Sequence, residues 1–377
     1  MGGVTLPWRE SLLIGVVGAG LLVAPNPLWS MLFYLGVLAP FLWQLRQGAV
    51  WPKDAGGAAG VALILWFTLA TVWDHAAHGH PRAHLIWLWN GLNTLAFFLA
   101  ARMAFGRAGE GRERLIPVLI GCGLANAVIG LALATLRGFP DGRMNGWAET
   151  RHPILGAAIM AVVVVLAAGR LLSGRGVRLN GAAVALGLLF IVATGSRGPL
   201  LAVAAALALL LLGLRPRLLL VLAGIGVAML FGVPGLAQAL SARLLERGWS
   251  DRLEIWRLAL HEVARRPLFG YGPSARLDRA ADNFPHDLFL STLFYSGAVG
   301  LFLLLVLLAL AGWGAWRARP AAARWTLLAL LLNTLLTGVS DLSQVTKGPG
   351  PMWYIVWLPV VLALGAPRPA QARPVRR

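Results

Sequence analysis

The sequence predicts an all-α polytopic membrane protein with about 12 transmembrane helices. Of its 377 residues, 58% are hydrophobic and 13% are charged, whereas roughly 25% are charged in ordinary soluble domains. Apolar runs of about 20 residues, the length at which a helix crosses a bilayer, recur from one end of the chain to the other. We expect residues 1–377 to form a single transmembrane domain.

Apolar runs between turn and charge signals define the candidate spans. They lie near residues 10–25, 28–45, 58–74, 84–104, 115–136, 153–172, 179–194, 198–214, 216–232, 286–315, 323–340 and 351–366. The first run follows Arg9 and Glu10 without a convincing signal-peptidase site, so we expect it to stay in the membrane as an anchor.

The basic residues orient these spans. With the N-terminus inside, every predicted cytoplasmic segment is basic, as the positive-inside bias requires. These residues are Arg9; Arg46 and Lys53; Arg102, Arg107, Arg112 and Arg114; Arg170, Arg175 and Arg178; Arg215 and Arg217; Arg317, Arg319 and Arg324; and Arg368, Arg373, Arg376 and Arg377. We therefore expect both termini in the cytoplasm, and we attribute the net charge of +18 to topology, with no nucleic-acid partner.

Three external segments carry arginine against this bias: the 137–152 loop, the turn at Arg197, and residues 233–285. We expect the last of these to form a periplasmic loop subdomain between the ninth and tenth spans. Its arginines are Arg243, Arg247, Arg252, Arg257, Arg265, Arg266, Arg276 and Arg279. Charge on the translocated side does not help to set topology, so an anionic substrate at the outer leaflet is the explanation that we favour.

Arg197 lies in the tight turn Thr194-Gly195-Ser196-Arg197-Gly198 between two apolar runs. An arginine in a bilayer costs roughly 2.5–3.5 kcal/mol on insertion scales, so it is usually paired or functional. The flanking glycines would let a ligand approach the backbone closely. The alternative is an arginine at a helix end whose guanidinium reaches the lipid headgroups.

Residues 250–266 are typical of an amphipathic helix that Ser250 caps and Pro267 ends. Its polar stripe consists of Glu254, Arg257, His261 and Arg265, and its apolar face of Ile255, Trp256, Ala259 and Val263. Arg252 falls in line with the apolar face, so we expect it to have a partner, and a substrate phosphate is one candidate. Arg265 is expected on the solvated face but within reach of a ligand. The alternative is an interfacial helix whose arginines hold lipid headgroups.

His286 opens the tenth span, with Asp287 beside it. A histidine there can be neutral near pH 7 and accept a proton from an alcohol, and a capping or packing role is the alternative. Before the sixth span, we expect the segments Arg143-Met144-Asn145-Gly146 and Arg151-His152-Pro153 to support the binding of an extended polar substrate. The histidines at 75, 78, 80 and 84 have no clear carboxylate or cysteine partners, so we expect no metal site there.

Three segments follow one another along the chain. They are Thr-Gly-Ser-Arg-Gly at 194–198; Arg252 and Trp256 with Arg-Pro-Leu-Phe-Gly-Tyr-Gly at 266–272; and Pro-His-Asp-Leu-Phe-Leu at 285–290 with Gly297 and Gly300 beyond. In sequence and order they resemble the O-antigen ligase and O-antigen polymerase superfamily of bacterial membrane glycosyltransferases. The layout of spans around one large external loop agrees over the full length. Family members often have Asn where this chain has Asp287, and Pro-Asn where it has His152-Pro153.

The resemblance implies a GT-C-like fold and a metal-independent transfer, without a cofactor, at the outer face of the bacterial inner membrane. The donor would be a glycan on undecaprenyl diphosphate, and the acceptor a sugar hydroxyl of lipid A–core. Arginines can stabilise a diphosphate leaving group through bidentate bonds. We assign Arg197 and Arg252 to the diphosphate, Arg143 and Arg265 to further substrate contacts, and His286 to the base of an inverting displacement.

Other functions fit the same sequence. A polymerase of this superfamily would use a similar donor and add the growing chain to another lipid-linked repeat, and related ligases modify other acceptors. A transporter or flippase without covalent chemistry also suits twelve spans. However, the chain lacks a convincing pair of interrupted apolar segments in matching halves.

Overall fold

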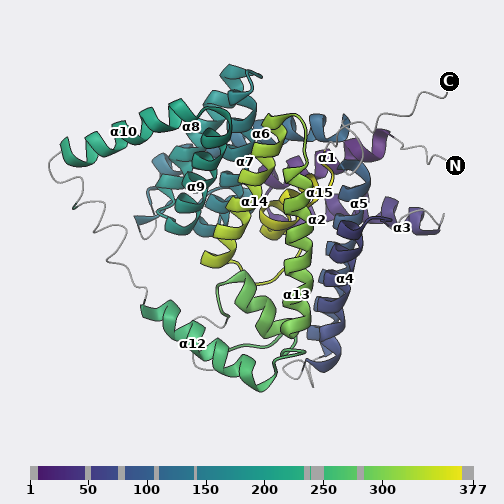
Figure 1. The fold of residues 1–377 in the computed structure, drawn as a ribbon. Coiled ribbons are helices and arrows are strands. Elements are labelled where there is room, and N and C mark those ends of the chain that lie inside the picture. Colours follow the sequence, from purple (N-terminus) through teal and green to yellow (C-terminus); the bar gives the residue numbers. More distant parts are fainter. Residues whose placement is uncertain are drawn as a thin grey trace, which may run out of the picture.

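The computed structural model describes residues 7–46, 52–74, 81–105, 110–139, 142–232, 238, 250–277 and 284–366, and these form a bundle of helices (Figure 1). No strand occurs within these ranges. The predicted class, a polytopic helical membrane protein, is confirmed.

A helix lies at each of the twelve predicted spans. In chain order the described elements are α1 (Pro7–Leu22), α2 (Asn26–Phe33), η1 (Tyr34–Leu38), α3 (Ala39–Arg46), α4 (Ala55–Leu69), η2 (Ala70–Trp73), α5 (Pro81–Phe105), α6 (Glu110–Arg137), η5 (Ala148–Thr150), α7 (Pro153–Leu172), α8 (Val177–Ala193), α9 (Arg197–Leu214), α10 (Pro216–Gly232), α12 (Ser250–Arg265), α13 (Leu288–Trp316), α14 (Ala321–Asp341), η6 (Trp353–Trp357) and α15 (Leu358–Leu364).

Seven stretches of the described chain are long and apolar enough to cross a membrane. They are Asn26–Arg46, Ala55–Trp73, Gly111–Arg137, Pro153–Leu172, Arg197–Leu214, Leu288–Trp316 and Ala321–Asp341. Four further apolar helices are shorter, Glu10–Leu22, Val177–Ala193, Pro216–Met229 and Trp353–Leu364. The structure therefore supports many spans, while the count of twelve stays a prediction.

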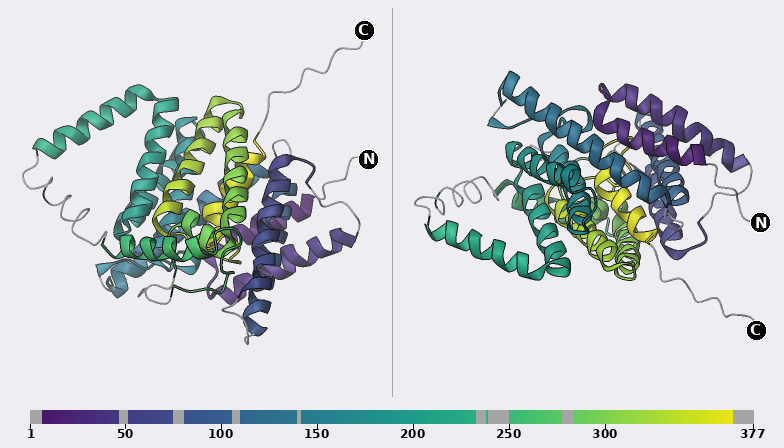
Figure 2. Two further views of the ribbon diagram at one scale, coloured as in Figure 1. Left: turned by 60° about the horizontal axis from the view of Figure 1, so that its bottom comes forward. Right: turned by 90° about the horizontal axis from the view of Figure 1, so that it is seen from above.

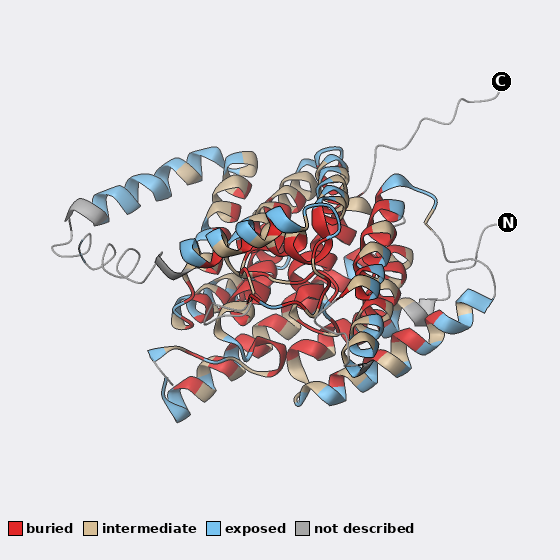
Figure 3. Ribbon diagram, turned by 90° about the horizontal axis from the view of Figure 1, so that it is seen from below, coloured by how far each residue is buried: buried red, intermediate tan, exposed pale blue. Residues whose placement is uncertain are grey.

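Helix α7 forms the centre of the bundle. Its residues 156–169 are all buried, and it packs against α8, α9 and α14. Buried residues gather in the middle of the bundle, and exposed ones lie around its edge (Figure 3). Glycines let neighbouring helices approach it closely: a Cβ at Gly123 of α6 would lie 2.6 Å from Val163, and one at Gly187 of α8 would lie 2.5 Å from Val164. In contrast, α10 extends away from the bundle (Figures 1 and 2), and most of its apolar residues between Leu218 and Met229 are exposed.

Helix α13 bends at Gly297, within the predicted continuous span 286–315. Gly297 has φ +68°, in the left-handed region, which glycine adopts without steric cost. A Cβ there would collide with the Leu268 carbonyl oxygen. The backbone N–H of Ala298 donates to the Pro267 carbonyl at 2.7 Å, so the segment after α12 inserts at the bend and satisfies backbone groups of α13.

Ion pairs lie at one end of the bundle, and α12 lies at the other. Arg102 pairs with Asp54 at 2.6 Å, and Glu113 pairs with Arg170 at 3.6 Å and with Arg175 at 3.1 Å. All of these lie in or beside segments predicted to be cytoplasmic. At the other end, α12 lies across the bundle (Figures 1 and 2) and packs against α13. The compartment that each end faces stays a prediction, as does a separate subdomain at 233–285, of which residues 238, 250–277 and 284–285 are described.

Candidate active site

Helix α12 carries Arg252 to the end of α14. As predicted, its residues Ile255, Ala259 and Val263 are buried and hold the helix against the bundle. The Trp256 indole N–H donates to the Pro285 carbonyl at 3.0 Å. This bond joins α12 to the residue before His286, so it fixes α12 against the segment that leads into α13.

The partner of Arg252 is the C-terminal end of α14. Its Nη2 lies 3.0 Å from Asp341 Oδ2, and its Nη1 donates to the Ser340 carbonyl. A cation suits this position because carbonyl groups at the end of a helix carry partial negative charge. The Asp341 side chain is 7% exposed and that of Arg252 is 36% exposed, so Arg252 is anchored at a buried carboxylate while part of its own side chain stays exposed.

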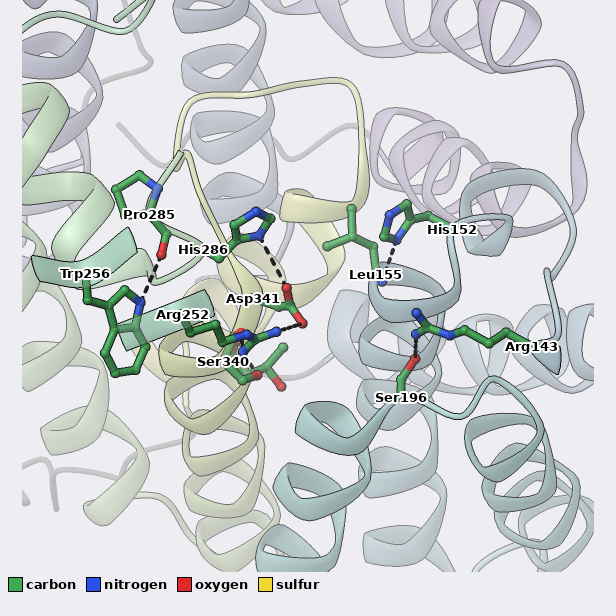
Figure 4. Close-up of polar contacts among 11 residues, drawn as sticks. Arg143, His152, Leu155, Ser196, Arg252, Trp256, Pro285, His286, Ser340 and Asp341 are labelled. Carbon is green, nitrogen blue, oxygen red and sulfur yellow. Dashed lines mark hydrogen bonds and ion pairs between the residues drawn. The ribbon is translucent and has the colours of Figure 1, made fainter. Parts of the chain in front are cut away.

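His286 approaches the same carboxylate from the other side. Its Nδ1 lies 3.5 Å from Asp341 Oδ1, and Figure 4 shows Arg252 and His286 both pointing toward Asp341. His286 has φ +52°, which is uncommon for a residue other than glycine. Asp287 Oδ1 accepts the Leu290 N–H at 2.7 Å and caps α13. Asparagine also caps helices well, which gives a structural reason why Asp and Asn can exchange at this position.

Arg143 holds the turn that leads to Arg197. Its Nε donates to the Thr194 carbonyl at 3.0 Å, and its Nη2 donates to Ser196 Oγ at 3.0 Å (Figure 4). Arg197 is the first residue of α9. A Cβ at the next residue, Gly198, would lie 2.5 Å from Ser340 Oγ. The turn is thus fixed between Arg143 and the end of α14. Ser340 makes the close approach at Gly198, and the approach of a ligand to this turn stays a prediction.

His152 completes the cluster. It caps α7, where its Nδ1 accepts the Leu155 N–H at 3.4 Å. Burial lowers its pKa; the Asp341 charge opposes this shift, and the charges of Arg143 and His286 reinforce it. The charges of Asp341, Arg143 and His286 therefore all act on His152. The arrangement combines cations for an anionic group with a histidine suited to proton transfer.

Not every predicted residue joins this cluster. Arg265 lies at the far end of α12, about 20 Å from Arg252 at 1.5 Å per residue. Its Nη1 pairs with Glu262 Oε1 at 3.2 Å, and its side chain is 63% exposed. The histidines at 75, 78 and 80 lie outside the described residues. Within the described ranges, no three His, Cys, Asp or Glu side chains are grouped so that they could hold a metal ion.

Asp341 is the site residue that the sequence reasoning missed. It stands at the end of the predicted span 323–340, in a chain with 15 acidic residues among 377. An acidic residue at the outer end of an apolar run was the available signal. Its two partners, Arg252 and His286, lie 89 and 55 positions earlier in the chain, so only the packing of the helices shows that Asp341 joins them.

Fold and site together define a polytopic helical membrane protein with an arginine- and histidine-rich polar site at one end of its bundle. Residues 182–305 match the O-antigen ligase family, and this segment includes Arg197, Arg252 and His286. An O-antigen ligase of Pseudomonas aeruginosa is 29% identical over 247 residues, which cover 63% of this chain. The matched region spans 61% of that relative's length. These matches confirm the resemblance to the O-antigen ligase superfamily.

Proposed function

We propose that this protein is an O-antigen ligase that transfers a glycan from undecaprenyl diphosphate to a sugar hydroxyl of lipid A–core. The observation that carries the proposal is the joining of Arg252 and His286 through Asp341. It brings a phosphate-binding cation and a proton acceptor together at one carboxylate. The family match and the similarity to a ligase support the same chemistry.

The arginines take the leaving group. Arg252 presents its outward part to diphosphate oxygens, and guanidinium–phosphate bonds are strong and directional. Arg197 stands at the N-terminus of α9, where the helix dipole also favours an anion. Arg143 stabilises the turn that positions Arg197. When the bond between the anomeric carbon and the phosphate oxygen breaks, its electron pair moves to the diphosphate, and these cations stabilise the added charge.

His286 acts on the acceptor. It removes the proton of the sugar hydroxyl as that oxygen bonds to the anomeric carbon, on the face opposite the diphosphate. The configuration at that carbon therefore inverts. Asp341 stabilises the imidazolium that forms, because its Oδ1 lies 3.5 Å from Nδ1. Metal-independent transfer follows from this assignment, in which arginines bind the phosphates.

The proposed setting is the bacterial inner membrane, with the site on the periplasmic side and both termini in the cytoplasm. The reacting end is the one where α12 lies (Figure 1). Its arginines meet the donor's diphosphate at the outer leaflet, where lipid A–core is also exposed.

A reconstituted assay tests the proposal. Purified protein in liposomes is given an undecaprenyl diphosphate-linked glycan, with or without lipid A–core, and the products are separated on gels. We expect glycan on lipid A–core only when that acceptor is present. His286→Ala should abolish transfer, whereas His261→Ala, at a histidine that is 63% exposed on α12, should retain it. Longer lipid-linked chains from donor alone would instead establish a polymerase, and movement of the lipid between leaflets without product would establish a flippase.

A further inference from the structure

A second site candidate lies at the far end of α12 from Arg252. A cavity of about 480 Å³ is lined by Trp73, Arg266, Pro267, Leu268, Phe269 and Gly270. Arg266 directly follows Arg265, the last residue of α12, which lies about 20 Å along the helix from Arg252. The cavity is therefore separate from the cluster around Asp341, and the proposed transfer does not use its residues.

The cavity lies where two apolar helices reach the end of the bundle. Trp73 ends the apolar stretch Ala55–Trp73. On the opposite wall, Pro267 and Leu268 accept backbone hydrogen bonds from Ala298 at 2.7 Å and Val299 at 3.5 Å, beside the bend of α13. Trp73 thus ends one apolar stretch, and the bend at Gly297 begins the arm of α13 that runs from Ala298 to Trp316. The cavity lies beside both, where we place the boundary of the apolar layer and the start of the lipid headgroups.

Aromatic rings form the apolar wall. The ring centroids of Trp66, Trp73 and Phe269 lie 5.4–5.8 Å apart. The Trp66 indole N–H donates to the Ser296 carbonyl at 2.8 Å, and that of Trp73 donates to the Phe269 carbonyl at 2.9 Å. Because internal bonds satisfy both indole N–H groups, the rings offer carbon surface to a neighbour. Phe269 is nonetheless 53% exposed and Leu268 is 58% exposed, which suits contact with acyl chains better than contact with water.

A cation stands at the rim of this apolar wall. The Arg266 guanidinium lies 5.0 Å from the centre of the Tyr271 ring. The neighbouring Arg265 is paired with Glu262, whereas no ion pair within the described part of the chain involves Arg266. Positive charge beside an apolar cavity at the membrane boundary is complementary to a lipid with a negatively charged headgroup.

We propose that this cavity binds an anionic phospholipid of the surrounding bilayer. Its phosphate lies at Arg266, and part of one acyl chain packs against Trp73, Leu268 and Phe269. The bound lipid anchors the C-terminal end of α12 and the segment that inserts at Gly297. This binding is independent of the glycan transfer proposed above, so each can fail without the other.

Photo-crosslinking tests the proposal. Phe269 is replaced by p-benzoylphenylalanine in the full-length protein, membranes are irradiated, and the lipid attached to the purified protein is identified by mass spectrometry. Phe302, which is 64% exposed on α13, receives the same replacement as the matched control. We expect anionic phospholipids among the Phe269 adducts to be enriched about fivefold over those at Phe302, the ratio that ~1 kcal/mol for one arginine near a membrane surface gives.

Charge variants identify the cause of the enrichment. Both charge variants are made in the protein that carries p-benzoylphenylalanine at position 269. Arg266→Gln should bring the lipid composition of the adducts back to that of the bulk membrane. Arg257→Gln, at an exposed arginine of α12, should leave the enrichment of anionic lipids unchanged. Adducts at Phe269 that match those at Phe302, or enrichment that survives Arg266→Gln, would overturn the proposal. So would a lack of lipid adducts at Phe269 while Phe302 reacts. Glycolipid adducts would also overturn it and would assign the cavity to a substrate.

Discussion

Replacement of Asp341 by asparagine separates the role of its charge from the role of its shape. Asp341 lies 3.0 Å from Arg252 and 3.5 Å from His286. At an effective dielectric constant of 20, unit charges 3.5 Å apart interact by about 5 kcal/mol. The partial exposure of both cations reduces this value, and we take about 2 kcal/mol as the loss of stabilisation for the imidazolium that forms at His286. The transfer rate should therefore fall about 30-fold.

The assay is the initial rate of glycan transfer in liposomes at matched protein content. Asp287→Asn is the matched control, because Asp287 is 9% exposed and its role is to cap α13, which asparagine also does. We expect that variant to stay within about twofold of the unaltered protein, since caps of similar strength exchange at little cost. If Asp341→Asn transferred at the full rate, or if Asp287→Asn were impaired as strongly, the role given to Asp341 would be wrong.

Three further outcomes follow from the structure. Gly198→Ala should lower the free energy of unfolding by about 1–3 kcal/mol, because its added Cβ overpacks against Ser340. Gly181→Ala should cause no such loss, because nothing lies within 4 Å of its added Cβ. Thermal unfolding of the two purified variants measures both effects. Burial raises the pKa of Glu149 to about 7, so its contribution to stability is fully present below about pH 4.5 and is lost as pH rises to 7. Glu149→Gln should therefore be more stable than the unaltered protein above pH 7. Equal midpoints of thermal unfolding for the two proteins at pH 8 would contradict this. Transfer should also persist in excess EDTA, and a loss that Mg²⁺ restores would contradict the use of arginines in place of a metal.

The sequence predicted those features that depend on local pattern. The periodicity of α12 placed Arg252 on the face of Ile255 and Val263, and both of these side chains are buried. The positions of the apolar runs predicted where the helices lie. Such features follow from the 3.6-residue repeat and from the length of a span, which a single chain shows without its partners.

Features that depend on packing between distant segments were not predictable. The partner of Arg252 comes from α14, and the reason for Gly198 is the approach of Ser340. The apolar run 286–315 gave no sign of the bend at Gly297, which depends on the carbonyl of Leu268 from another segment. Arg265 lies on the same helix as Arg252 and carries the same charge, but it is thirteen positions further along α12 and so lies outside the cluster around Asp341.

The most direct test of the proposed function is the ratio between the two products of the transfer. The reconstituted protein is given donor and lipid A–core, and mass spectrometry quantifies both the glycosylated lipid A–core and the released undecaprenyl diphosphate. The mechanism predicts equal amounts of the two products, and the loss of both in His286→Ala. Release of undecaprenyl diphosphate without glycosylated lipid A–core, or transfer by His286→Ala at the unaltered rate, would contradict it.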